Sequence, residues 1–278
     1  MDGTSDYIKY ARSDMLHWKA LTDRMKEAEN LIWLAENSKV RCPKAYAAWE
    51  EKDPDGDPIY ILMMEYIDAL CLSPSMWKAT TEENKEIICR KIGEQLKLLR
   101  EVKLEGKQYY GRINYQGVSS IYQIFRVYSK PVRGPYDTHD EFLTALREAM
   151  IHETALRSWE KHFFESDEER FANVKPVLGA SKATEATLTH LDVKDHNILA
   201  KPIKNGTTGE IEDWEVTIID WDTLTWMPAY LQYVSLNERF LGTWDDTEYK
   251  RIWVYTGEEP YDMENDFLHE DKDWYAFC

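Results

Sequence analysis

The sequence lacks the features of membrane, secreted and zinc-finger proteins. No apolar run approaches the roughly 20 residues that a membrane-spanning helix needs, and the amino-terminal segment MDGTSDYIKYARSD lacks the basic and then apolar order of a secretory signal. The four cysteines are scattered without CxxC spacing, which indicates neither a zinc site nor a disulfide framework and predicts buried free thiols. We therefore expect a cytoplasmic protein with no membrane contact.

Positive charge is also scarce. The 34 Lys and Arg residues are outnumbered by 51 Asp and Glu residues, which gives a formal net charge of -17. Phosphate backbones recruit net positive surfaces, so we expect no nucleic-acid partner. Two interpretations of the negative charge stay open: it suits a cationic substrate, or it forms a solvated surface that serves solubility.

Internal repeats and low-complexity linkers are absent as well, whereas apolar side chains suffice for a sizeable core. Hydrophobic residues make up 43% of the 278 positions, with 11 Trp and 17 Tyr among them. Apolar periodicity and turn clusters predict helices and hairpins, with helices over 14–37, 81–102, 139–165 and 228–257, strands 45–51 and 60–67 around DPDGDP, and strands 198–203 and 214–220 around NGTTGE. This order predicts an α+β fold, with a sheet-bearing amino-terminal portion at 1–68 and a larger, mainly helical carboxy-terminal portion at 69–278.

The stretch TLTHLDVKDHNILA, residues 187–200, gathers polar residues immediately before an apolar run. Asp and Asn favour turns over strands, so its polar part should be a loop and its apolar part a strand that leaves the loop. The predicted hairpin begins one residue after Asn197 and ends at Asp220. Its return strand should therefore bring Asp220 back beside the loop that holds Asp192 and Asn197.

An amide and a carboxylate brought together in this way offer oxygen ligands of the kind that Mg²⁺ accepts. Asn197 and Asp220 are the candidate ligands, with substrate phosphate and water completing the coordination. Asp192 can then orient or deprotonate a hydroxyl, as in phosphoryl transfer. Asp222 is either a second metal ligand or a cap or ion-pair partner, and we expect Asp195 and His196 to face solvent.

The segment HLDVKDHN has the spacing H-x-D-x-x-x-x-N, and IIDWD follows Asn197 at a distance typical of a metal-binding segment. The pair resembles the catalytic loop and metal segment of the aminoglycoside phosphotransferase and choline kinase group more closely than those of protein kinases, which usually carry Arg after the His, DFG and a later APE. The segments WDTLTWMPAYLQYV and GPYDTHDEFLTAL are similar to stretches of fungal members of this phosphotransferase family.

The resemblance implies a protein-kinase-like bilobal fold and transfer of phosphate from ATP, with Mg²⁺, to a hydroxyl of a small molecule. It implies that Asp192 is the catalytic residue, that Glu27 pairs with a phosphate-binding Lys9, and that the backbone of Glu65, Tyr66 and Ile67 contacts adenine. His190 is expected to be structural. Trp226, Tyr230 and Tyr233 either pack in the core or line an acceptor pocket.

One departure from the family pattern concerns the nucleotide. Family members carry a glycine-rich hairpin before the strand that bears the lysine, whereas only eight residues precede Lys9 here. Without the backbone amides of such a hairpin we expect weaker ATP binding. Two alternatives to a kinase therefore stay open: a pseudokinase or ligand-binding module, and a biosynthetic enzyme that uses the cleft without ATP.

Overall fold

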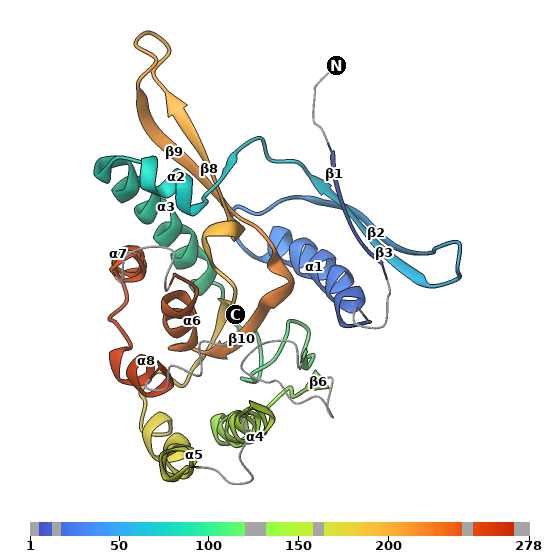
Figure 1. Cartoon of the computed structure of the whole chain (residues 1–278), viewed down its shortest axis with the longest axis vertical. Coiled ribbons are helices and arrows are strands. Elements are labelled where there is room, and N and C mark those ends of the chain that lie inside the picture. The colour runs from blue at the N-terminus through green and yellow to red at the C-terminus, as the bar shows by residue number, and fades with distance from the viewer. Residues whose placement is uncertain (1–5, 13–17, 120–131, 158–163, 241–246, 270–278) are drawn as a thin grey trace. The chain divides into compact units, whose positions relative to one another are not determined.

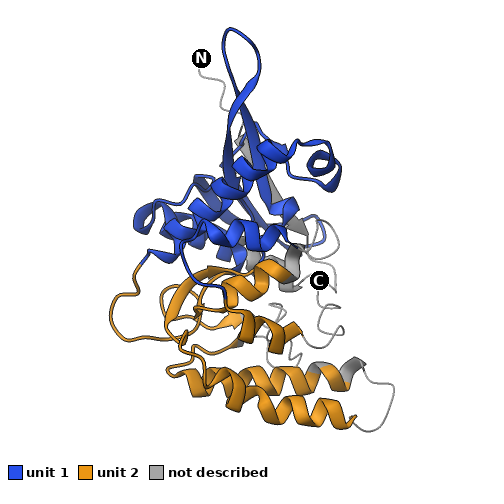
Figure 2. Ribbon diagram, turned by 90° about the vertical axis from the view of Figure 1, so that its left-hand side faces the viewer, with its two compact units in different colours: residues 1–102, 192–223, 239–260 blue, residues 103–191, 224–238, 261–278 orange. Residues whose placement is uncertain are grey.

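The structure is a computed structural model that describes residues 6–12, 18–119, 132–157, 164–240 and 247–269. Its contacts divide the chain into two compact units (Figure 2), unit 1 with residues 1–102, 192–223 and 239–260 and unit 2 with residues 103–191, 224–238 and 261–278. Both units combine helices with antiparallel strand pairs, which confirms the predicted α+β class. The predicted lobe boundary after residue 68 stays a prediction.

The amino-terminal part of unit 1 is a three-stranded antiparallel sheet covered by a helix (Figure 1). The sheet has the order β1-β3-β2, and helix α1 packs against β2 and β3. Leu62 and Met64 of β3 and Leu31 and Leu34 of α1 are buried between them. The elements are β1 (Asp6–Arg12), α1 (Trp18–Asn37), β2 (Ala45–Lys52) and β3 (Pro58–Glu65).

Two boundaries here refine the sequence-based prediction. The hairpin around DPDGDP forms as predicted, but its second strand ends at Glu65 rather than at Ile67. Helix α1 ends at Asn37 as predicted, and the predicted start at residues 14–17 lies outside the described residues.

A second antiparallel sheet of unit 1 contains the other predicted hairpin. Strand β8 pairs with β9, with Ile198 opposite Ile218, and the short β4 flanks β8. Helix α3 packs against β9 and against α7. The elements are β4 (Leu70–Cys71), α2 (Pro74–Ala79), α3 (Glu82–Arg100), β8 (Ile198–Lys204), β9 (Ile211–Ile218) and α7 (Glu248–Val254).

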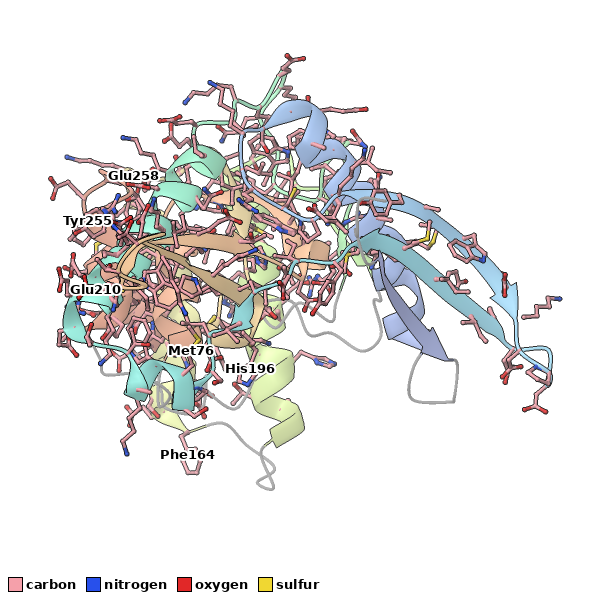
Figure 3. All side chains as sticks on the ribbon, turned by 90° about the horizontal axis from the view of Figure 1, so that it is seen from above. Met76, Phe164, His196, Glu210, Tyr255 and Glu258 are labelled. Atoms are coloured by element: carbon pink, nitrogen blue, oxygen red, sulfur yellow. The ribbon has the colours of Figure 1, made fainter. Side chains whose placement is uncertain are left out.

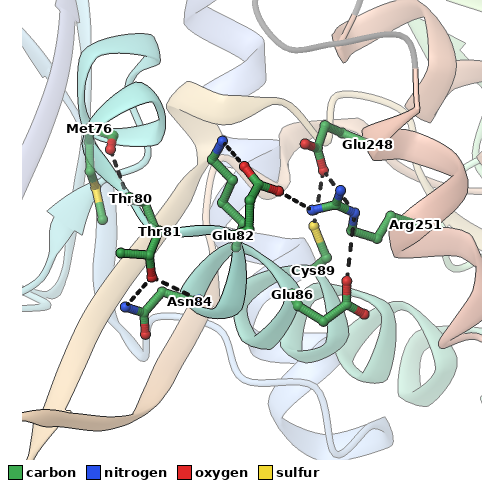
Figure 4. A network of polar contacts seen from close by, with 10 residues as sticks. Met76, Thr80, Thr81, Glu82, Asn84, Glu86, Cys89, Glu248 and Arg251 are labelled. Carbon is green, nitrogen blue, oxygen red and sulfur yellow. Dashed lines mark hydrogen bonds and ion pairs between the residues drawn. The ribbon is translucent and has the colours of Figure 1, made fainter.

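Polar contacts fix α3 against α7 (Figure 4). Arg251 of α7 lies 3.4 Å from a carboxylate oxygen of Glu82 and 3.6 Å from one of Glu86, both on α3. The buried Cys89 thiol donates to Glu248 Oε2 at 3.5 Å. A β-carbon at Gly93 would lie 2.4 Å from Ile252 O, so this close approach of the helices requires glycine. Helix α3, which packs against β9, is thus firmly held by α7.

Unit 2 is mainly helical around one apolar core. Strand β7 pairs with β10 and β5 pairs with β6, all antiparallel. The predicted helical block at 139–165 contains the whole of one helix and the first residue of the next, and residues 158–163 between them lie outside the described residues. The elements are β5 (Val118–Ser119), β6 (Val132–Arg133), α4 (His139–Arg157), α5 (Glu165–Leu178), β7 (Ala186–His190), β10 (Leu224–Pro228), α6 (Leu231–Phe240) and α8 (Asp262–His269).

Two further expectations concern cysteines and membranes. Cys89 is buried as predicted, but Cys71 is exposed because it lies on β4, a strand of only two residues with both side chains exposed. Among the described helices, each is too short or too polar to cross a lipid bilayer.

Candidate active site

The loop before β8 holds an aspartate and an asparagine against each other. Asn197 Nδ2 donates to Asp192 O at 2.9 Å and to Asp192 Oδ2 at 2.9 Å. Both residues are buried. Asn197 is the last residue of a short 3₁₀ turn, Asp195–Asn197, and β8 starts directly after it. One amide therefore fixes the backbone and the carboxylate of Asp192 together, which defines the direction of the remaining carboxylate oxygen.

The hairpin brings Asp220 to the same end of the sheet. Ile198 pairs with Ile218, and one residue further out the Ile219 amide donates to Asn197 O at 2.9 Å. Asp220 follows directly, with a φ of 66° in the left-handed region that few residues other than glycine adopt. The predicted juxtaposition of Asn197 with the segment that carries Asp220 is thus present in the backbone, and it includes a strained position at the acidic residue.

A lysine that sequence reasoning missed also reaches the loop. Lys194 Nζ lies 2.9 Å from Asp192 Oδ2, and its side chain is partly exposed. The only available sign in the sequence was a cation two residues after Asp192 in a loop of acidic residues. The pair places a positive charge at the carboxylate that the resemblance identifies as catalytic.

Asp195 does not face solvent, and that expectation was wrong. Asp195 is 2% exposed, whereas the His196 side chain is 63% exposed. His196 is labelled in Figure 3. The Asp195 carboxylate accepts from the His196 amide at 2.7 Å and contacts the His196 ring nitrogen Nδ1. The Asp195 carbonyl accepts from the Ile198 amide within the 3₁₀ turn, and Cys71 packs on this turn, so Asp195 is enclosed.

Cys71 of β4 packs on the same turn. Its thiol lies 3.6 Å from His196 O and 3.9 Å from Asp195 O. Partial desolvation of the thiol where it contacts this turn, and then the negative charge of Asp195, raise the pKa of Cys71 above its ordinary value, although the residue as a whole is exposed. The thiol therefore stays protonated at neutral pH and offers the site no thiolate nucleophile.

On α1, the predicted Glu27 occupies a buried position. It is 1% exposed, and carboxylates at such depth are usually paired with a cation. Lys9 lies in β1 opposite Leu62, a residue of the sheet face that packs on α1. The side chain of Lys9 lies outside the described residues, so its pairing with Glu27 stays a prediction.

The segment predicted to meet adenine is the connection from β3 to β4. Glu65 ends β3, and its amide donates to Lys44 O at 2.8 Å while its carboxylate accepts from the Lys44 amide at 3.2 Å. Ile67 O accepts from the Ala69 amide at 2.9 Å. Tyr66 is exposed. These contacts define a short, turned backbone segment, and its role with a nucleotide stays a prediction.

The donor set fits Mg²⁺ bound jointly by protein and phosphate. No group of three or more His, Cys, Asp and Glu side chains suited to a metal occurs within the described ranges. Mg²⁺ typically takes only one or two protein carboxylates and completes its shell with water and phosphate oxygens. The hydrogen bonds of Asn197 use its amide nitrogen, which leaves the carbonyl oxygen for a hard cation. Asn197 and Asp220 would hold the ion.

In unit 2, the remaining residues selected from the sequence are buried. Trp226, Tyr230 and Tyr233 are all buried, as core packing requires. The backbone of His190 is bracketed by Gln232, whose side chain accepts from the His190 amide at 2.9 Å and donates to its carbonyl at 3.0 Å. These contacts position the end of β7, from which the loop with Asp192 continues.

Comparison with known proteins gives one family and one fold. The model of the phosphotransferase enzyme family matches residues 14–264. No curated protein matches the chain in sequence.

Solved aminoglycoside phosphotransferases share the architecture. The streptomycin–ATP ternary complex of APH(2'')-IIa is 14% identical with a TM-score of 0.59, over 97% of this chain and 77% of that chain. The gentamicin complex of APH(2'')-IIa is 13% identical with a TM-score of 0.58, over 98% and 77%. ADP-bound APH(2'')-Ib is 15% identical with a TM-score of 0.55, over 98% and 84%. At such identity the likeness shows the fold, which is the predicted protein-kinase-like one.

Proposed function

The chain belongs to the phosphotransferase enzyme family, and from this membership we propose that it transfers the terminal phosphoryl group of ATP to a hydroxyl of a small molecule. The observation that carries the proposal is the hydrogen-bonded pair of Asp192 and Asn197 at the hairpin end where Asp220 returns. Phosphoryl transfer needs positioning and charge stabilisation more than covalent chemistry from the protein. The held Asp192 carboxylate supports the first, and Asn197 with Asp220 would hold the Mg²⁺ that provides the second.

We assign Asp192 the role of orienting the acceptor hydroxyl and taking its proton. The hydroxyl oxygen forms a bond to the terminal phosphorus of ATP, the bond from that phosphorus to the bridging oxygen breaks, and ADP leaves with the electron pair. The hydroxyl proton passes to the Asp192 carboxylate. Asn197 holds that carboxylate by its backbone and by Oδ2, so the group is orientated before the substrate arrives.

Charge around the phosphates is the second requirement. Bound Mg²⁺ would neutralise phosphate oxygens, held by the Asn197 carbonyl and the Asp220 carboxylate. Lys194, at 2.9 Å from Asp192 Oδ2, is close enough to attract an incoming phosphate while it balances the carboxylate. At the other end of the nucleotide, Lys9 steadied by Glu27 would contact the α and β phosphates.

Adenine is assigned to the connection after β3. The Glu65 amide already donates to Lys44 O, so adenine would use other backbone groups of Glu65, Tyr66 and Ile67. For the acceptor, the net charge of -17 favours a cationic alcohol over an anionic one. The aminoglycosides named for the similar structures are alcohols of this kind and form one class to test.

The test measures binding and product separately. Titration calorimetry with ATP, with and without Mg²⁺, should show binding that the metal strengthens, and its affinity also tests the expectation of weak ATP binding. Phosphorus NMR should then show a phosphate ester when cationic alcohols such as kanamycin or choline are supplied. A reaction without acceptor is the control, because it separates transfer from hydrolysis of ATP. Metal-independent binding, or ATP binding with no ester from any alcohol, would contradict the proposal and favour a ligand-binding module.

A further inference from the structure

A buried asparagine on α1 holds the backbone that follows Asp220. Asn30 is 0% exposed, and its Nδ2 lies 2.6 Å from Trp221 O and 3.4 Å from Asp222 O. The two carbonyls belong to the first residues of the single 3₁₀ turn Trp221–Thr223. One side chain, from a helix almost two hundred positions away in the sequence, therefore fixes the two residues next to Asp220.

This segment needs outside support because Asp220 adopts an unfavourable backbone conformation. Its φ of 66° lies in the left-handed region, which a residue with a β-carbon adopts at a free-energy cost and keeps only when its surroundings hold it. On the near side, the Ile219 amide is tied to Asn197 O at 2.9 Å, and the Trp221 indole donates to Ile218 O at 2.7 Å. Asn30 supplies the contacts from α1 on the far side.

The same helix face carries the residue assigned to the phosphate-binding lysine. Glu27 and Asn30 are three positions apart, which places them side by side on one face of a helix, and both are buried. Any displacement of α1 (Figure 1) moves the two groups together. The middle of α1 is thus linked to the segment that follows Asp220 by a direct hydrogen bond from Asn30.

We propose that Asn30 is a positioning residue that sets the direction of the Asp220 carboxylate, so that the position of α1 and the binding of Mg²⁺ with ATP are coupled. The inference rests on the proposed function, because it assigns the metal to Asp220. Groups that orient a metal ligand from behind typically change metal affinity about 10–100-fold when they are removed. Coupling of this kind is reciprocal, so metal-bound nucleotide also restrains α1.

The test is the ratio of ATP affinity with Mg²⁺ to ATP affinity in EDTA, measured by calorimetry. Asn30→Ala should lower this ratio at least about tenfold while affinity in EDTA stays within about twofold, because only the metal-dependent part depends on Asp220. Asn37→Ala is the matched control: it removes the same side chain from the same helix, where Asn37 is exposed and donates to Trp33 O of its own helix at 2.8 Å. The control should keep the parental ratio.

The outcomes separate the two proposals. A parental protein without any Mg²⁺-dependent gain would refute the proposed function itself. A parental gain that Asn30→Ala retains in full would refute only the positioning role. Thermal unfolding without ligand checks that each variant folds. If Asn30→Ala does not fold, Asn30→Ser, which keeps a hydroxyl donor, takes its place. We expect Asn30→Ser to lower the ratio of ATP affinity with Mg²⁺ to ATP affinity in EDTA as well. Failure of both variants to fold would overturn the positioning role in favour of a purely structural one.

Discussion

Two hairpins of unit 1 carry hydrogen-bonded polar groups at opposite ends. In the β2–β3 hairpin, the acidic residues of DPDGDP lie at the tip, and Asp53 Oδ1 accepts from the amides of Asp55 and Asp57 at 3.0 and 2.9 Å. In the β8–β9 hairpin, Asn197 and Asp220 lie at the open end, where the chain enters and leaves the sheet. The first group completes a turn, and the second faces a loop held by side chains from elsewhere.

The difference shows that a high density of carboxylates is a poor guide to a site. The first hairpin has more of them, but its buried carboxylate is occupied by the amides of its own turn. At the open end of the second, Asn197 holds the Asp192 carboxylate, and Asn30 of α1 binds the Trp221 carbonyl next to Asp220. Convergence from distant parts of the chain, together with support from behind, distinguishes chemistry from turn formation.

The largest expected effect is on turnover, which should depend on Asp192 in the loop before β8 and not on the β2–β3 tip. Asp192→Asn keeps the size and an acceptor for Asn197 but removes the negative charge that takes the proton. Turnover should fall about 10²–10⁴-fold, the range of a general base, with ATP affinity and thermal stability close to parental. Asp57→Asn makes the same change on an exposed residue of the tip and should leave turnover unchanged. Equal turnover in the Asp192 variant and the parent would show that this loop is not catalytic.

The next effect concerns Asp220, whose charge should determine metal-dependent ATP affinity and whose backbone conformation should determine stability. Asp220→Asn and Asp220→Ala should both remove the metal-dependent part of ATP affinity, because each lacks the anionic ligand. Only Asp220→Ala should also unfold more easily, by about 1 kcal/mol, since asparagine tolerates the left-handed conformation better than alanine. Calorimetry with and without Mg²⁺ measures the first quantity and denaturant unfolding the second. Retained metal dependence in both variants would move the metal away from Asp220.

The sequence predicts both hairpins because their signals are local. The turn-forming clusters DPDGDP and NGTTGE between apolar segments determine where the chain turns, and antiparallel geometry then returns Asp220 to Asn197. Asn30 could not be found in this way, since its partner Trp221 is 191 positions distant and helical periodicity does not show which neighbour covers a polar residue. The burial of Asp195 escaped prediction for a related reason, because Cys71 of β4, which packs on its turn, is 124 positions distant.

Short apolar runs limited the prediction of unit 2. The run LTWMP forms β10, which ends at Pro228, the residue at which the predicted helical stretch 228–257 was expected to begin. Five buried residues fit a strand or a helix turn equally well by periodicity, and pairing with β7 decides between them. The helical part of the prediction is confirmed by α6 and α7, while residues 241–246 lie outside the described residues.

A smaller effect concerns the β2–β3 tip alone. Asp53→Ala removes the acceptor for two backbone amides and should lower the free energy of unfolding by about 1 kcal/mol, with ATP binding and turnover unchanged. Asp53→Asn keeps an oxygen in the same place and should cost less. Denaturant unfolding of the three proteins makes the comparison. A loss of Mg²⁺-dependent ATP binding in Asp53→Ala would mean that this acidic tip takes part in the site after all.

The smallest effect compares the two tips through one glycine in each. At Gly56 the φ is +92°, and an added β-carbon would meet nothing within 4 Å, so Gly56→Ala suffers backbone strain without a clash. At Gly206 there is equal space and φ lies outside the left-handed range. Gly56→Ala should therefore destabilise the fold by about 1 kcal/mol, whereas Gly206→Ala should stabilise it by about 0.4–1 kcal/mol through the lower entropy of the unfolded chain. Denaturant unfolding measures both, and shifts of the same sign would show that the two turns do not differ in backbone conformation as described.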